Sequence, residues 1–284
     1  MVNINGPIVS VIIATYNRAK SLGTAIESVL KQSYCNIEII VVDDGSTDET
    51  KKIVQPYIKN YAIRYIYQKN KGCVEARNNG IKIAKGKYIA ILDDDDFWCD
   101  DKKIEKQVNF FEKNTDYVLV GGGAIKIDQD GKEIVRYLLP EKDIDIRKIL
   151  LVSDSFANVT ALFKKDAWEK LGGYDENFDG LEDWELWLRM GRIGKFYNIQ
   201  EFFVKYSGHQ HGNPGYAEKR YSRLEFLKLN IKLKKKYSRD YPNYRRALLL
   251  SWLGYFYSLL PFSRELWPAM FKLRILLSKK YYHK

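Results

Sequence analysis

Residues 88–98 read YIAILDDDDFW, an apolar run followed at once by four aspartates and two aromatic residues. The apolar run predicts a buried strand. Carboxylates crowded at the end of such a strand raise one another's pKa values or require a cation. Without a neighbouring Cys or His, they suit hard ions such as Mg²⁺ or Mn²⁺. A solvated turn is the alternative, but aromatic residues directly after the acidic run are not typical of an exposed tip.

Short apolar runs alternate with helix-periodic segments through the first hundred residues. The expected strands are 8–14, 37–42, 63–67 and 88–92, and the expected helices are 20–31, 47–59 and 72–85. This alternation predicts an α/β fold with a doubly wound, mostly parallel sheet flanked by helices. Ser46 and Glu49 predict a capping box at the start of the second helix. Ligands of such sheets bind beyond the carboxyl ends of the strands.

Three of these strand ends carry polar residues. They read Thr15-Tyr16-Asn17-Arg18, Asp43-Asp44-Gly45-Ser46 and the four aspartates that begin at Asp93. The sequence has no G-x-x-x-x-G-K-[ST] loop, and no G-x-G-x-x-G follows the first strand. A nucleotide bound at this edge would therefore depend on a metal for its phosphates, which excludes most kinases and dehydrogenases.

The pattern changes beyond residue 92. We expect helices at 101–113 and 181–190, a strand at 117–120, and close backbone approach at the glycines of 121–123. After a glycine-rich stretch, helices are expected at about 217–237, 243–260 and 264–278. The chain is thus expected to divide into an α/β domain at 1–215 and a C-terminal helical extension at 216–284.

Composition and charge narrow the class of protein. The 284 residues include 45% hydrophobic and 29% charged residues, which is typical of a globular protein and excludes disorder and collagen-like repeats. Three cysteines fit neither a disulfide framework nor a zinc site, and the N-terminus shows no secretory signal, so a cytoplasmic setting is expected. The net charge is +11, and residues 216–284 carry 17 Lys+Arg against 4 Asp+Glu. Such a basic segment favours an acidic partner, either nucleic acid or an anionic membrane.

Six co-linear segments resemble the family 2 nucleotide-sugar glycosyltransferases of the kind that builds bacterial surface polysaccharides. They read VSVIIATYNR (9–18), EIIVVDDGSTD (38–48), GCVEARNNGI (72–81), YIAILDDDDFW (88–98), GGYDENF (172–178) and GLEDWELWLR (180–189). The similarity covers roughly residues 7–210. It is specific because all six segments match the family together, in the same order and spacing. It implies a GT-A fold and transfer of a sugar from a nucleotide donor, with UDP as the nucleotide that family precedent favours.

The resemblance also implies a donor site. The expected donor-binding residues are Thr15, Tyr16, Arg18, Asp44, Arg77, Asp93 and Asp94. Tyr16 and Asp44 would hold the base, with Asp44 facing its imide edge. Arg77 falls where the family has a basic residue beside the donor, although a solvent-facing helix residue is the alternative. The D-x-D motif implies Mn²⁺ or Mg²⁺ bound by Asp95 and Asp93, with His209 as a further candidate ligand.

The acceptor region is expected at Glu182, Asp183 and Trp184. Glu182-Asp183 matches the family's E-D motif, in which the aspartate is the general base that deprotonates the acceptor hydroxyl. The helix N-terminus would lower the pKa of Asp183, whereas desolvation by Trp184 and Trp187 would raise it. One base without a partner nucleophile implies a single displacement with inversion at the anomeric carbon.

The partners follow from these roles. We expect a nucleotide-sugar donor and a glycan or lipid-linked acceptor. The uncharged segment at 247–263 is marginal for a membrane span, so its helix either packs on the protein or lies in an anionic membrane interface on the inner face of the plasma membrane. A nucleic-acid-binding module is the alternative function, but it leaves the strand-end motifs unexplained, so no nucleic acid is expected as partner. A metal-dependent nucleotidyltransferase or phosphatase leaves Glu182-Asp183 unexplained.

Overall fold

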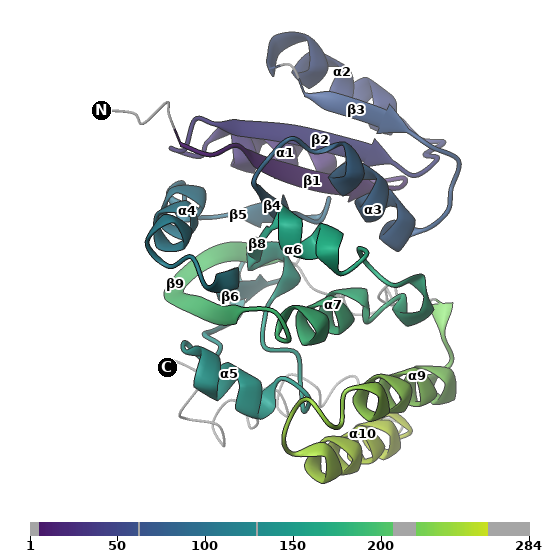
Figure 1. The fold of residues 1–284 in the computed structure, drawn as a ribbon. Helices are drawn as coiled ribbons and strands as arrows, with labels where there is room; N and C mark the ends of the chain where they lie inside the picture. Colours follow the sequence, from purple (N-terminus) through teal and green to yellow (C-terminus); the bar gives the residue numbers. More distant parts are fainter. Residues whose placement is uncertain (1–5, 62, 129, 207–219, 261–284) are drawn as a thin grey trace.

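The computed structural model describes residues 6–61, 63–128, 130–206 and 220–260, and its centre is a nine-stranded sheet (Figure 1). The strands are β1 (Val9–Thr15), β2 (Ile37–Asp43), β3 (Arg64–Tyr67), β4 (Tyr88–Ile91), β5 (Asp96–Trp98), β6 (Tyr117–Ile127), β7 (Glu133–Tyr137), β8 (Leu162–Lys164) and β9 (Lys195–Tyr206). The sheet order is β3-β2-β1-β4-β8-β6-β9-β5, with β7 paired to β6.

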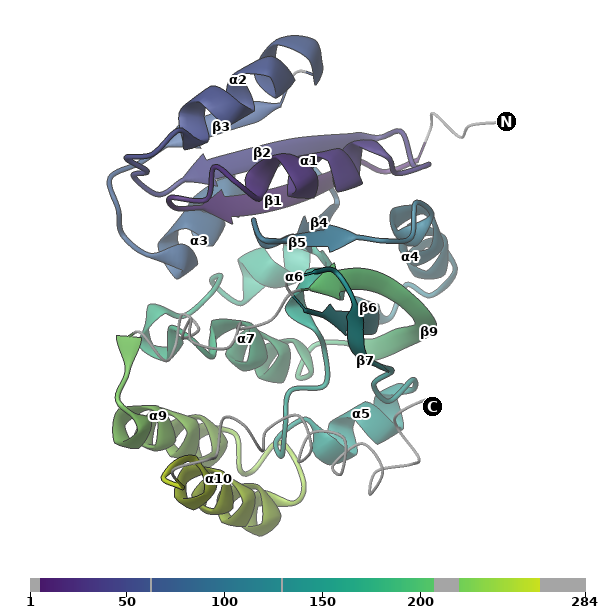
Figure 2. The ribbon, with the colours of Figure 1, turned by 180° about the vertical axis from the view of Figure 1, so that it is seen from behind.

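Helices cover both faces of the sheet, as a doubly wound fold requires. They are α1 (Leu22–Leu30), α2 (Thr50–Tyr61), α3 (Cys73–Ile83), α4 (Lys103–Lys113), α5 (Asp143–Ile149), α6 (Lys165–Lys170), α7 (Glu182–Met190), α9 (Arg223–Lys236) and α10 (Tyr244–Ser258), with 3₁₀ turns η1 (Asn158–Thr160) and η2 (Glu176–Phe178). The view in Figure 1 has α3, α6 and α7 in front of the sheet, and Figure 2 shows α1 on the opposite face.

The first four strands form the parallel part of the sheet. Val9 of β1 lies opposite Ile37 of β2 and Tyr88 of β4, and both pairings are parallel. Because their carboxyl ends share one edge, the three polar strand ends come together there. Beyond β4, β8 runs antiparallel to both β4 and β6, whereas β6 and β9 are parallel. The predicted α/β fold is confirmed.

Alternation along β1 divides the core between the two faces. Val11 and Ile13 belong to the cluster that includes residues of α1, α2 and α4, whereas Ile12 belongs to the cluster that includes residues of α3, α6 and α7. This period of two is what a strand covered on both faces must show. The central strands of the first half of the chain are therefore covered on both faces and carry the strand-end loops at one edge.

The triple glycine lies inside β6, which continues to Ile127 rather than ending at residue 120 as the sequence predicts. A Cβ atom added at these three positions would overlap the side chains of Asn198, Phe203 and Leu138, respectively. The predicted close approach is thus confirmed, but it occurs within a strand. Because glycine has a low strand propensity, the sequence did not predict that β6 continues beyond residue 120.

Helices α9 and α10 continue the core on the side of α7. Leu233 and Tyr237 share a buried cluster with Trp187, and the Tyr237 hydroxyl donates to Glu185 of α7. The predicted helices at 217–237 and 243–260 correspond to α9 and α10 over the described residues, whereas the helix expected at 264–278 lies outside them. The expected domain boundary at 215 also lies outside them and stays a prediction. Within the described ranges, no helix is long and apolar enough to cross a bilayer.

Candidate active site

The loops after β1 and β2 are joined by hydrogen bonds. Asn17, at φ 54°, accepts through Oδ1 from the Thr47 amide at 2.8 Å, and its own amide donates to Ser46 Oγ at 2.9 Å. Ser46 therefore does not cap α2, and the predicted capping box is wrong. Asp48 Oδ1 instead accepts from the Thr50 amide at the start of the helix.

Asp44 fixes the next loop at the same edge. Its amide donates to the Thr15 carbonyl, so Asp44 lies beside the β1 loop that carries the half-exposed Tyr16. The buried Asp44 carboxylate accepts from Gln68 Nε2 at 2.7 Å, and from the backbone amides of Lys71 at 2.9 Å and Gly72 at 2.8 Å. The structure thus brings Thr15, Tyr16 and Asp44 together, with Asp44 also holding the loop that leads into α3.

The acidic run after β4 lies next to the β1 loop. Arg18 Nη1 is 3.3 Å from Asp95 Oδ2, and Arg18 Nε is 3.9 Å from Asp94 Oδ1. Burial raises the pKa of Asp94 to about 7, and the charges of Asp95 and Asp93 add to this rise, while Thr15 and Arg18 oppose it. The run thus lies beside the β1 loop with Asp94 buried and Asp93 and Asp95 partly exposed, and its role in the site stays a prediction.

Arg77 joins the acidic run to the first turn of α7. This side chain of α3 is only 8% exposed. Its Nη2 atom donates to Asp93 Oδ1 at 2.6 Å, and its Nη1 atom donates to Glu182 Oε1 at 2.6 Å. The alternative of a solvent-facing helix residue is therefore wrong. One buried cation brings the D-x-D and E-D motifs to the same place.

Both carboxyl groups of the E-D motif have raised pKa values. Burial raises the pKa of Glu182 to about 7 even though Arg77 opposes the shift. Burial also raises the pKa of Asp183, against the opposing effects of Arg77 and of the Trp184 amide. That amide donates to Asp183 Oδ1 at 2.7 Å. Desolvation therefore outweighs the helix dipole in setting the pKa of Asp183.

Trp184 turns away from these carboxylates. Its indole Nε1 donates to the Leu150 carbonyl at 2.6 Å, and the residue is 6% exposed. Trp184 therefore shapes the expected acceptor region through packing and desolvation. His209, the third candidate metal ligand, lies outside the described residues.

Two further residues belong to the site but were not predicted as site residues. Burial, together with the charge of Asp183, raises the pKa of Asp154 well above its ordinary value. Burial also raises the pKa of Tyr174, although the nearby Arg77 opposes the shift; Asp183 contributes to the rise. Tyr174 lies in GGYDENF and could have been found there, whereas nothing in the sequence around Asp154 marks it.

The carboxylates of the site can be compared with the ligands that a divalent ion requires. Over the described ranges, no three or more His, Cys, Asp or Glu side chains converge into a metal cluster. The side chains of Asp93 and Asp95 nevertheless stay 37% and 36% exposed beside their arginine partners. Two carboxylates suffice for Mg²⁺ when water and substrate phosphates complete its coordination shell. The residues present therefore fit a hard divalent ion at Asp93 and Asp95.

Comparison with known proteins identifies the family of this chain. The family model described as Glycosyl transferase family 2 matches residues 10–172. The chain is 37% identical over 211 residues to an uncharacterized glycosyltransferase, RP339, of Rickettsia prowazekii, covering 72% of this chain and 64% of that protein. It is also 37% identical over 209 residues to the putative glycosyltransferase EpsE of Bacillus subtilis, covering 71% of this chain and 73% of EpsE. The match thus spans just under two thirds of the rickettsial relative.

Solved structures share the fold. S. aureus TarS 1–349 in complex with UDP-GlcNAc matches with a TM-score of 0.67 and 18% identity, over 89% of this chain and 73% of that one. The mannosyltransferase PcManGT from Pyrobaculum calidifontis, in complex with GDP-Man and Mn²⁺, matches with a TM-score of 0.62 and 18% identity, over 97% of this chain and 76% of that one.

Proposed function

The chain belongs to glycosyl transferase family 2, and from this premise we propose that it transfers a sugar from a UDP-sugar to a hydroxyl of a glycan or lipid-linked acceptor, with inversion. The observation that carries the proposal is the buried guanidinium of Arg77. It contacts Asp93 of the D-x-D motif and Glu182 of the E-D motif, each at 2.6 Å. Arg77 thereby links the sheet edge that is proposed to bind the donor to the first turn of α7, which carries the candidate base.

The strand-end loops supply the donor site in this proposal. Tyr16, exposed beside Asp44, would cover the base, and Arg18, which contacts Asp95, would meet a phosphate. Asp93 and Asp95 would hold a divalent ion, Mn²⁺ or Mg²⁺, which when bound stabilises the charge that develops on the leaving diphosphate. The two fold relatives solved with UDP-GlcNAc and GDP-Man support a nucleotide-sugar donor.

Asp183 is the proposed general base. Its oxygen takes the proton of the acceptor hydroxyl while that hydroxyl oxygen forms a bond to the anomeric carbon and the bond to the diphosphate breaks. A pKa raised by burial brings the carboxylate nearer to neutral pH, where a base is most effective. Glu182, fixed by Arg77 and by the Gly180 amide, orients this turn of α7.

A donor panel tests the proposal. Thermal unfolding is measured with nucleoside diphosphates, nucleotide sugars and oligonucleotides, each with Mn²⁺ and with EDTA, and the products formed from the nucleotide sugars are analysed. Stabilisation by UDP or a UDP-sugar that requires Mn²⁺ is expected. A shift with oligonucleotides alone would favour the nucleic-acid-binding alternative. Release of free phosphate, or transfer of the nucleotidyl group, would favour the metal-dependent phosphatase or nucleotidyltransferase.

We also propose that α10 lies on the cytoplasmic face of an anionic membrane. Four large apolar side chains at helical spacing are each more than 40% exposed on it: Leu249, Trp252, Leu253 and Phe256. The rings of Trp252 and Phe256 are stacked at 5.9 Å. An apolar stripe on a strongly basic segment is typical of a helix that lies in a membrane interface.

A further inference from the structure

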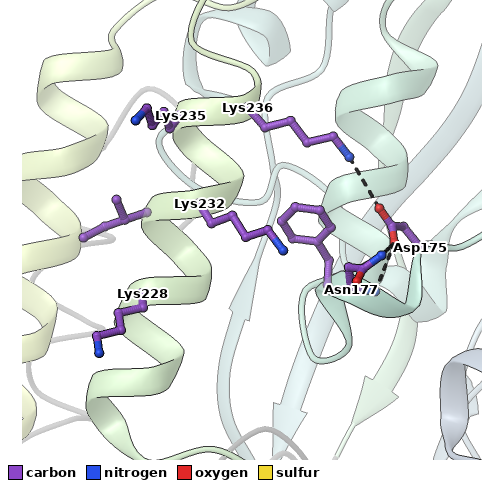
Figure 3. Close-up of a pocket in the computed structure, with 8 residues that line it drawn as sticks. Asp175, Asn177, Lys228, Lys232, Lys235 and Lys236 are labelled. Carbon is purple, nitrogen blue, oxygen red and sulfur yellow. Dashed lines mark hydrogen bonds and ion pairs between the residues drawn. The ribbon is translucent and has the colours of Figure 1, made fainter.

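Helix α9 presents lysines to a pocket of about 740 Å³ beside η2. The pocket is lined by Asp175, Asn177, Phe178, Lys228, Ile231, Lys232, Lys235 and Lys236. Figure 3 shows Lys232 and Lys236 extending from α9 toward Asp175 and its neighbours, with Lys228 and Lys235 extending on the other side of the helix. We call this the lysine pocket.

The opposite face of α9 fixes the position of these lysines. Leu227, Leu233 and Tyr237 are buried, and the buried Lys234 donates to the Ala247 carbonyl of α10 at 3.1 Å. The lining lysines fall at i, i+4, i+7 and i+8, so their Cα atoms lie on one side of a helix with about 3.6 residues per turn, and their side chains diverge from there (Figure 3). Packing of the buried residues against α7 and α10 therefore leaves the side of α9 that carries the lysines facing the pocket.

The pocket holds more positive charge than its ion pairs neutralise. Lys236 Nζ contacts Glu185 Oε1 at 2.8 Å and Asp175 Oδ2 at 3.4 Å, so the single carboxylate of the lining is matched. Lys232 Nζ lies 5.0 Å from the centre of the Phe178 ring. In the described part of the chain, no carboxylate oxygen lies within ion-pair distance of Lys228, Lys232 or Lys235. The lining therefore includes three lysines beyond those matched by a carboxylate, and this excess of positive charge favours an anionic ligand.

The pocket borders η2 and, through the contact of Lys236 with Glu185, it adjoins α7, whose first turn carries the E-D motif. Phe178, at the end of η2, is four residues before Glu182, and Glu185, which contacts Lys236, is two residues after Asp183. On the basis of the proposed glycosyl transfer, we infer that the lysine pocket binds a phosphate group carried by the acceptor. A phosphate offers several acceptor oxygens and up to two negative charges to the three ammonium groups, whereas a neutral glycan gains little from them.

Calorimetric titration with two phosphate ligands tests the inference. Geranyl diphosphate represents a lipid carrier, an oligomer of glycerol phosphate represents a phosphodiester glycan, and geraniol and glycerol are their uncharged counterparts. EDTA is present throughout to suppress metal-dependent binding at the donor site. The test variant carries Lys228→Gln, Lys232→Gln and Lys235→Gln, and the single variant Lys232→Gln guards against misfolding of the triple variant.

A matched control removes the same charge from an exposed face of α2, with Lys51→Gln, Lys52→Gln and Lys59→Gln. We expect at least one phosphate ligand to bind about tenfold more weakly to the test variant than to wild type, because three ammonium groups that could contact the phosphate are removed. Binding to the control variant should stay within about twofold of wild type, because its lysines lie on another helix.

The pattern of losses identifies the source of the phosphate. A loss confined to geranyl diphosphate assigns the pocket to a lipid carrier, and a loss confined to the phosphodiester assigns it to a glycan backbone. Equal losses in the test and control variants, or no loss in the test variant, would overturn the inference. Mn²⁺-dependent UDP binding is measured separately on wild type and the test variant, so failure of the donor proposal is recognised independently.

Discussion

Arg77 Nη1 lies 2.6 Å from Glu182 Oε1, although 105 residues separate the two in the chain. Both side chains are 8% exposed. The same guanidinium reaches Asp93, so one cation from α3 holds together a loop after β4 and the start of α7. The arrangement of the site therefore depends on a buried ion pair whose desolvation is costly.

Replacing Arg77 by Gln should destabilise the fold by about 3 kcal/mol at pH 8, because Glu182 is left buried without its partner. The loss should be smaller at pH 5, where Glu182 binds a proton. Urea unfolding at the two pH values measures the difference. The double variant Arg77→Gln/Glu182→Gln is the control, and at pH 8 it should lose less unfolding free energy than Arg77→Gln alone. Equal destabilisation of the two variants would contradict this explanation.

Glu182 should make stability fall as the pH rises. Its pKa is raised by burial from 4.5 to about 7, so between these values the folded state binds a proton that the unfolded state has released. The contribution is fully present below about pH 4.5 and is lost as the pH passes about 7. Glu182→Gln should remove this pH dependence. The loss of unfolding free energy between about pH 4.5 and pH 7 should then be smaller than in wild type by up to about 3 kcal/mol, at about 1.4 kcal/mol per pKa unit. Denaturant unfolding from pH 4 to 8 tests it, and an unchanged slope would show that Glu182 is not the titrating group.

Asp95→Ala should remove metal-dependent donor binding, because one of the two exposed carboxylates proposed to hold the ion is lost. The Mn²⁺-dependent affinity for UDP should fall at least about 100-fold, given the several kcal/mol that a divalent ion contributes. Titration calorimetry with Mn²⁺ and with EDTA measures it. Asp101→Ala, an exposed site with the same charge change, should bind as wild type does. Full Mn²⁺-dependent affinity in Asp95→Ala would exclude the metal role.

Asp183→Asn should keep donor binding but slow transfer by about 10² to 10⁴-fold, the usual contribution of a general base. Turnover is measured with the donor that the panel identifies, alongside its binding constant. Asp130→Asn, in the exposed turn between β6 and β7, is the matched control. Wild-type turnover in Asp183→Asn would rule this residue out as the base.

Trp252→Gln/Phe256→Gln should weaken binding to anionic vesicles about tenfold or more, because each large apolar side chain contributes about 1.5 to 3 kcal/mol when buried. Sedimentation with phosphatidylglycerol vesicles measures it. The control Tyr61→Gln/Tyr67→Gln alters two side chains that are 58% and 60% exposed on the first half of the chain. Equal sedimentation of wild type and the α10 variant would leave α10 without a membrane role.

The first half of the fold is predictable because its signals are local. The strands expected at 8–14 and 37–42 correspond to Val9–Thr15 and Ile37–Asp43. Continuous β-branched runs bounded by polar turns allow no other reading, and parallel pairing then gathers their carboxyl ends. The acidic residues at that edge could therefore be predicted from the sequence together with the family resemblance.

The rest depends on contacts between distant segments. The sequence does not show that Arg77 is buried, since α3 carries polar residues on several sides; its burial follows only from the approach of α7. Asp154 lies in a loop without a periodic pattern, and its place next to Asp183 is a tertiary result. β9 was not predicted as a twelve-residue strand because its polar and apolar residues do not alternate cleanly, and its partners come from two other parts of the chain.

The position of β9 has a practical consequence for anyone shortening this protein. The family-defining segment ends at residue 172, yet β9 is inserted between β6 and β5 in the middle of one half of the sheet. A piece ending at the family boundary would leave two unpaired strand edges open to water and to other molecules, which invites aggregation. A minimal folded fragment must therefore extend at least to Tyr206.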